Sequence, residues 1–186
     1  MSPPKDRNRI PPLEPKSAAG KTKQIFDEMQ VKFGMVPNLF RVLGNAPAAL
    51  EAYVNFSIAL SGGILDTKIQ EQIGLTVADS NLCDYCLSAH MFMAGKIGLT
   101  REEIDDAIRA RAADPKTDAI LKLARGIIIQ RGELPDSDLQ HARDSGLTDA
   151  AIVEVLANVV LNIFMNYLDH VARTVVDFPP APSGTT

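Results

Sequence analysis

Both cysteines of the chain lie in one short motif, Cys83-Asp-Tyr-Cys86, and a histidine, His90, follows four residues later. In a helix, residues at i, i+3 and i+7 share one face, so these three side chains would point the same way. Glu71 stands twelve residues before the first cysteine. A dithiol with an acid or base on each side is suited to thiol redox chemistry.

The residues just before the motif indicate how it is positioned. Asp79, Ser80 and Asn81 are poor helix-interior residues and good caps or turns, so a new helix is predicted to begin near Cys83. Cysteines in a first turn feel the unpaired N–H groups and the positive end of the helix dipole, which lower a thiol pKa. His90 could take up the proton of the second thiol. Glu71 lies on the preceding helical pattern and could fold back towards Cys83.

The motif has other possible interpretations. Two cysteines can simply be small buried apolar residues, and this alternative stays open. A structural zinc site needs four ligands, and this stretch offers three at most. Haem attachment needs a histidine directly after the second cysteine, where this chain has Leu87. A thioredoxin-like motif lies beside a βαβ pattern, and the sequence has no strand pattern. A redox dithiol on an all-helical scaffold fits best.

The motif resembles the active-site signature of the AhpD-like alkylhydroperoxidases, within the carboxymuconolactone decarboxylase superfamily, in four residues: Glu71, Cys83, Cys86 and His90. Two further stretches resemble its peroxidase-related branch, namely 34–40 and the ending from 166–170 to 177–179. The resemblance covers about residues 10 to 180. It implies a single all-α, AhpD-like domain.

The resemblance also implies a role for each residue. In that family the second cysteine attacks the peroxide, which implies that Cys86 is peroxidatic, and the first one resolves the product, which implies that role for Cys83. Glu71 and His90 are then a proton relay. The chain departs from the best-known member at Tyr85, where that member has a second histidine.

Composition limits the compartment and the partners. The chain has 186 residues, enough for one domain with a substantial core. Its net charge of −4 and the lack of a basic run argue against nucleic acid or a membrane as a partner. Residues 1–15 lack the apolar region of a secretory signal, and no apolar run approaches a membrane span. We therefore expect a cytoplasmic protein, in which C-x-x-C indicates redox or metal chemistry.

Apolar periodicity, caps and breakers predict seven to nine helices. Asp66 should cap the helix that carries Glu71, Thr100 should open a capping box, and Ser137 should cap a short helix. Ile58 is expected to point inward. The predicted ranges are 17–33, 47–60, 66 to beyond 77, 83 to 95 or 98, 100–112, 117–130, 137–145 and 149–175. A short piece at 39–43 is predicted to be helical or extended.

The ends of the chain and its last helix complete the organisation. A proline-rich arm is expected at 1–16, either on a neighbouring subunit or disordered, an all-α domain at 17–178 and a disordered tail at 179–186. The last helix is long and apolar, which predicts a homo-oligomer, and the family resemblance implies a dimer, trimer or hexamer. It also carries a polar stripe that should bond to neighbouring helices, another subunit or the catalytic helix: Asn158, Asn162, Asn166 and His170.

The leading functional hypothesis is a thiol peroxidase that takes a hydroperoxide and an external dithiol reductant, with no metal, haem or flavin cofactor. Three alternatives remain: a disulfide reductase or electron carrier that serves a separate peroxidase, a decarboxylase-type enzyme of the same superfamily, and a non-catalytic redox-sensing oligomer. A decarboxylase does not need the dithiol, so the motif argues against it.

Overall fold

The computed structural model describes residues 8–179, which form helices and no strands, as the all-α prediction required. The first residues of the predicted arm, 1–7, and most of the predicted tail, 180–186, lie outside the described residues. A short 3-10 turn at Pro15–Ser17 precedes nine α-helices: α1 (Gly20–Phe33), α2 (Asn38–Leu43), α3 (Pro47–Ser61), α4 (Thr67–Ser80), α5 (Asp84–Lys96), α6 (Arg101–Ile108), α7 (Pro115–Ile129), α8 (Asp136–Asp144) and α9 (Asp149–Ala172).

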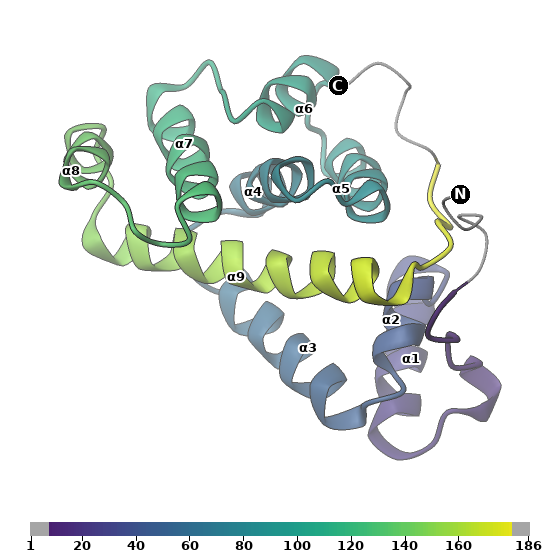
Figure 1. The fold of residues 1–186 in the computed structure, drawn as a ribbon. Helices are drawn as coiled ribbons and strands as arrows, with labels where there is room; N and C mark the ends of the chain where they lie inside the picture. Colours follow the sequence, from purple (N-terminus) through teal and green to yellow (C-terminus); the bar gives the residue numbers. More distant parts are fainter. Residues whose placement is uncertain (1–7, 180–186) are drawn as a thin grey trace, which may run out of the picture.

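Helix α4 is the centre of the larger part of the molecule, because α5, α6, α7 and α9 all pack against it (Figure 1). Its side chains are buried on nearly every side from Gln72 to Ala78. Ile73, Leu75 and Val77 belong to one apolar core with residues of α6, α7 and α9. A helix that is apolar all round is held in place by its neighbours, so α4 is a rigid base for the side chains it carries.

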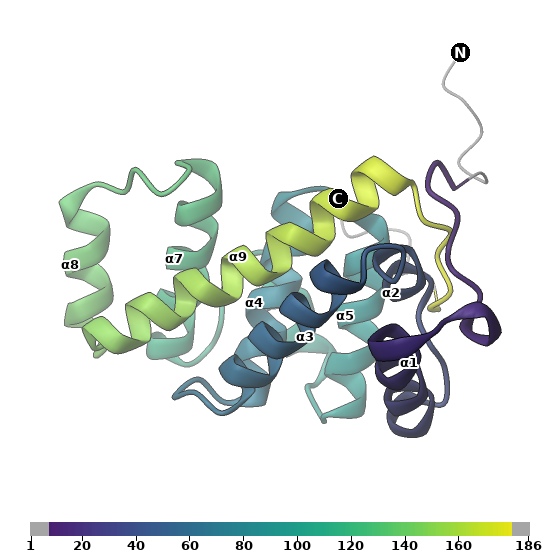
Figure 2. The same ribbon diagram turned by 90° about the horizontal axis from the view of Figure 1, so that it is seen from below.

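Helix α9 crosses the whole molecule and separates this core from α1, α2 and α3, which lie along its other side (Figures 1 and 2). A second apolar cluster fills that junction. Phe26, Leu50 and Met165 are buried in it, and so are both cysteines. The cysteine motif therefore lies where the two parts of the fold meet.

Most predicted caps are confirmed, and a few details are wrong. Asp66 accepts a hydrogen bond from the Ile69 N–H at 2.9 Å, and Thr100 forms the full capping box. Ser137 does not cap α8, because that helix already begins at Asp136, after Pro135. Ile58 was expected inside and is 62% exposed, since the face of α3 that carries it has no helix packed on it.

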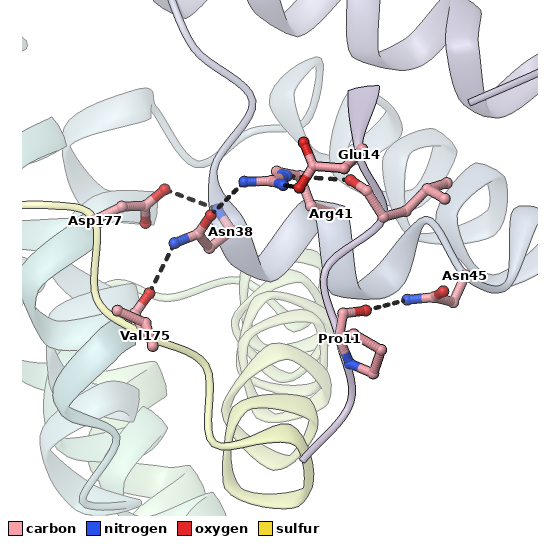
Figure 3. A network of polar contacts seen from close by, with 8 residues as sticks. Pro11, Glu14, Asn38, Arg41, Asn45, Val175 and Asp177 are labelled. Atoms are coloured by element: carbon pink, nitrogen blue, oxygen red, sulfur yellow. Dashed lines mark hydrogen bonds and ion pairs between the residues drawn. The ribbon is translucent and has the colours of Figure 1, made fainter. Parts of the chain in front are cut away.

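Residues 8–14 and 174–179 run over α2 of the same chain. Arg41 pairs with Glu14 and donates to Asn38, and the Asn38 side chain donates to the carbonyl of Val175 at 3.0 Å (Figure 3). Asn45 donates to the carbonyl of Pro11 at 2.9 Å (Figure 3). The two ends of the described chain are thus fixed to the same short helix.

Candidate active site

The cysteine motif opens α5, as its spacing predicted. Cys83 is the N-cap residue, and its sulfur accepts a hydrogen bond from the Cys86 N–H at 3.2 Å. A tight turn precedes it, in which Leu82 has a φ of 56°. The two cysteines form a disulfide, with 5.3 Å between their Cα atoms. The pair is therefore placed for a dithiol/disulfide cycle without movement of the backbone.

Glu71 and His90 form a pair across α4 and α5. His90 Nδ1 lies 2.8 Å from Glu71 Oε2, and both side chains are mostly buried. Glu71 therefore meets His90, whereas the sequence suggested that it would turn towards Cys83. The ring fits because α4 has a glycine one turn further on: a Cβ on Gly74 would lie 2.6 Å from Nδ1. The role of Gly74 could not be predicted from the sequence, because it depends on the packing of two helices.

The environment of His90 raises its pKa above the ordinary value. Burial by itself lowers the pKa of the imidazole, but the charge of Glu71, its hydrogen bond and a hydrogen bond with Asn162 outweigh burial. With Glu71 ionised, the proton on Nδ1 is donated to the carboxylate, which fixes the orientation of the ring. His90 can therefore hold a proton for delivery to a leaving group.

One cavity of about 360 Å³ joins these groups. Cys86, Glu71 and His90 line it, but Cys83 does not. Most of the remaining wall is apolar, with side chains such as Phe33, Phe40, Phe92, Met93, Met165 and Phe178. Lys32 and Lys96 also line it and are exposed. Cys86 is thus the sulfur that a bound molecule would meet, and Cys83, 1% exposed, lies behind it.

Tyr85 is a structural anchor in this chain. Its ring is buried, its oxygen accepts from the Leu39 N–H at 3.1 Å, and its hydroxyl donates to Asp177 at 2.7 Å. Phe178 packs edge-on against the same ring and reaches the cavity wall. Burial, together with the carboxylate of Asp177, keeps the pKa of Tyr85 well above its usual range. The residue in the middle of the motif therefore holds the C-terminal segment over the cavity.

The end of α9 holds the turn that leads into the motif. Asn166 accepts from the Asn81 side chain at 2.9 Å, and His170 Nε2 lies 3.4 Å from the carbonyl oxygen of Leu82. Asp169, which the sequence did not single out, lies 3.6 Å from the sulfur of Cys83 through its Oδ2 atom. We call these three residues of α9 the α9 clamp.

The first two residues of the predicted polar stripe have other hydrogen-bond partners. Asn158 and Asn162 donate to carbonyls of their own helix, those of Glu154 and Asn158, at 2.8 and 2.9 Å. Asn162 also lines the cavity with His90 and helps to raise the pKa of its imidazole. Within the stripe, Asn162 thus lines the cavity, Asn166 and His170 hold the turn before α5, and Asn158 bonds within its own helix.

Comparisons with known proteins agree with this architecture. Residues 46–127 match the carboxymuconolactone decarboxylase family. A peroxidase-related protein with an alkylhydroperoxidase AhpD core from Ralstonia eutropha JMP134 has a TM-score of 0.81 at 23% identity, over 94% of this chain and 93% of its own. A peroxidase-related protein from Silicibacter sp. TM1040 has a TM-score of 0.78 at 21% identity, over 98% and 96%.

A third similar structure is the debrominase Bmp8, with a TM-score of 0.78 at 18% identity over 91% of this chain and 92% of its own. The comparison with curated proteins finds no significant match. At these identities the structural likeness establishes the fold, and the fold by itself does not select one reaction.

Proposed function

We propose that the chain is a thiol-dependent peroxidase of the AhpD-like carboxymuconolactone decarboxylase superfamily, a proposal supported by its fold and by the family match over residues 46–127. One observation carries the proposal. Cys86 shares a cavity with the Glu71–His90 pair, and its disulfide partner Cys83 lies directly behind it. A nucleophile, a proton donor and a resolving thiol are thus assembled at one site.

The geometry supports the following sequence of steps. The Cys86 thiolate attacks the distal oxygen of a hydroperoxide, the O–O bond breaks, and His90 gives its proton to the departing alkoxide. The products are an alcohol and a Cys86 sulfenic acid. The sulfur of Cys83 then attacks that of Cys86, which releases water and forms the disulfide. An external dithiol reduces the disulfide by exchange and completes the cycle.

The cavity wall supports a substrate class. A space of about 360 Å³ with an apolar wall fits an organic hydroperoxide with a hydrocarbon or aromatic body better than hydrogen peroxide. The ammonium groups of Lys32 and Lys96 lie over phenylalanine rings, 5.3 and 4.7 Å from the ring centres. They place positive charge at the cavity wall, which suits a substrate that also carries a negative charge.

Steady-state peroxide consumption with dithiothreitol as the reductant tests the proposal. Cumene hydroperoxide should give a higher kcat/KM than hydrogen peroxide, and Cys86→Ser should abolish turnover with both. Cys86→Ser serves as the control for peroxide that dithiothreitol consumes by itself. If reduced wild-type protein exchanges disulfides readily but consumes no peroxide, the chain is instead a disulfide reductase or electron carrier.

A further inference from the structure

The two sulfurs of the motif have different surroundings, and the proposed steps include an acid–base group for Cys86 alone. Cys86 faces the cavity with the Glu71–His90 pair, whereas Cys83 faces away from it. The sulfur of Cys83 has a carboxylate of its own, because Asp169 Oδ2 lies 3.6 Å away. This distance is that of a thiol–carboxylate hydrogen bond once the disulfide is reduced.

Cys83 must exchange a proton during the cycle without the Glu71–His90 pair that lies beside Cys86. A thiol that is 1% exposed is hard to ionise, yet it must lose its proton when it attacks the Cys86 sulfenic acid. When a reductant later attacks Cys86, Cys83 leaves as a thiolate and must regain a proton. Within residues 8–179, the Asp169 carboxylate is the acid or base in hydrogen-bonding contact with this sulfur.

Asp169 is held in place and connects the buried sulfur to the outside. Its Oδ1 atom accepts from the Thr174 N–H at 3.2 Å, and its neighbours in the α9 clamp hold Asn81 and Leu82. The side chain is only partly buried, so Oδ2 contacts the enclosed sulfur while the carboxyl group keeps access to solvent. A proton passed to Asp169 can therefore leave the protein.

The charges around Asp169 favour proton transfer. Burial raises the pKa of its carboxyl group, and Asp84 of α5 raises it further, while hydrogen bonding to Thr174 and the charge of His170 act in the opposite direction. Tyr85 is the other titratable group of α5 that interacts with this carboxylate. A raised pKa brings the carboxyl group closer in pKa to the Cys83 thiol. Proton transfer between the two groups then becomes easier in both directions.

We propose that Asp169 is a catalytic acid–base for Cys83. As Cys83 attacks, its thiol proton passes to the Asp169 carboxylate and the S–S bond forms. The hydroxyl group of the sulfenic acid takes a proton from His90, which has been reprotonated from solvent through the cavity, and leaves as water. As the reductant thiolate attacks Cys86, the S–S bond breaks and Asp169 returns a proton to the departing Cys83 sulfur. The site thus has two acid–base systems, one for each sulfur.

This inference rests on the proposed peroxidase function, and single-turnover kinetics of Asp169→Asn test it. Asparagine keeps the shape of the side chain and an oxygen for the Thr174 N–H. In reduced protein mixed with one equivalent of cumene hydroperoxide, peroxide loss should be as fast as in wild type. Disulfide formation should slow by about 100-fold or more, as for loss of general base catalysis. The Cys86 sulfenic acid should accumulate and be trapped by dimedone.

The pH profile separates a chemical role from a structural one. In Asp169→Asn, the rate of disulfide formation should rise with pH up to the pKa of the Cys83 thiol, because hydroxide must replace the lost base. In wild type the rate should already be high at neutral pH. Asp149→Asn, the same substitution at the exposed start of α9, twenty positions before Asp169, should keep the wild-type profile.

A second assay needs no peroxide, so its result does not depend on the peroxidase proposal. Reduction of the preformed disulfide by dithiothreitol should also be slower in Asp169→Asn, because Cys83 leaves without a proton donor. Should wild type form no sulfenic acid, the peroxidase proposal fails while this assay still decides the role of Asp169. Wild-type rates in both assays would overturn the inference. If Asp169→Asn does not fold, Asp169→Glu, which keeps an acid, should fold and retain disulfide formation.

Discussion

At the residue scale, Gly74 makes the Glu71–His90 pair possible. Alanine there would improve the helix propensity of α4 by about 1 kcal/mol, but its Cβ would lie 2.6 Å from His90 Nδ1. Overpacking of this kind costs about 1–3 kcal/mol, so the net effect on the free energy of unfolding should be destabilising. We predict that Gly74→Ala lowers the melting temperature and reduces peroxidase kcat about 10-fold or more, through loss of acid–base help.

A glycine of α5 provides the matched control for this variant. A Cβ on Gly95 would meet nothing within 4 Å. Gly95→Ala should therefore stabilise the protein by roughly 0.5–1 kcal/mol and leave turnover unchanged. Equal activities in the two variants would mean that the imidazole can move aside without consequence.

The raised pKa of His90 gives a second prediction. Glu71→Gln removes the charge that outweighs burial, so the pKa of the imidazole should fall, and the ring should lose its proton at lower pH. NMR titration of the His90 ring in the two proteins measures this directly. The pair should stabilise the fold below pH about 6.5, and this contribution should be lost as the pH rises through the folded-state pKa.

The unequal positions of the two sulfurs predict unequal chemistry. Peroxide should leave a dimedone-reactive sulfenic acid on Cys86 in Cys83→Ser protein, because Cys86 lines the cavity. Cys86→Ser protein should give little adduct on Cys83, which does not line it. Mass spectrometry of the two variants locates the adduct. An adduct on Cys83 alone would exchange the roles and leave the dithiol cycle standing.

The residues of the site differ in how far sequence could predict them. The spacing of Cys83, Cys86 and His90 follows from helix geometry, so their common helix start was predictable. Gly74 and Asp169 were not, because each depends on which helices meet. Asp169 lies 86 positions from Cys83, and no local pattern connects the two.

At the element scale, Tyr85 joins the start of α5 to α2 and to the C-terminal segment. Tyr85→Phe removes the hydroxyl group that accepts from Leu39 and donates to Asp177, and it leaves the buried Leu39 N–H without this partner. We predict a loss of about 1–3 kcal/mol in the free energy of unfolding, measured with urea. The KM for cumene hydroperoxide should rise, because Phe178 would be held less firmly at the cavity wall.

Tyr167 offers a comparison for that variant. It is 56% exposed, and its ring stacks on His170. Tyr167→Phe should change the unfolding free energy by less than about 0.5 kcal/mol, as is usual at the surface. A similar loss in both variants would show that the hydroxyl group of Tyr85 is not the cause.

Helix starts were predictable where a side chain forms the cap, and less so elsewhere. Thr100 caps α6 after a glycine with φ of 81°, and Thr148 caps α9 after another with φ of 88°. The start of α8 was misplaced because Pro135 begins it with its fixed backbone angle and no side-chain cap. The end of α6 at Ile108 was missed because the turn that follows uses Ala110 with φ of 55°, where sequence would favour glycine.

At the scale of the whole molecule, α9 leaves one apolar face uncovered. A row of exposed apolar side chains repeats every three or four residues along it: Val153, Leu156, Val160, Phe164, Tyr167 and Val171. In length and mean hydropathy, 1.7, this helix would suffice to span a membrane, but 44% of the apolar window is buried in the protein. The sequence showed no such run because the asparagines of the polar stripe interrupt it.

This exposed row supports the predicted self-association. We expect a dimer or larger homo-oligomer by light scattering, because a contiguous apolar face of this length is a common interface between subunits. Val160→Glu should weaken the assembly and shift the mass towards the monomer. Val31→Glu, on the exposed side of α1, places the same charge away from the row and should leave the mass unchanged. A monomeric wild type at micromolar concentration would contradict the expectation.

The α9 clamp also determines when the site can form during synthesis of the chain. A ribosome completes Glu71, Cys83, Cys86 and His90 long before it completes Asn166, Asp169 and Phe178. Until then the turn at 81–83 has no α9 to hold it, and the apolar cluster around the thiols lacks Met165. The nascent chain therefore presents the two cysteines without their α9 contacts. The site acquires its full geometry only when α9 has left the ribosome and folded back onto the turn.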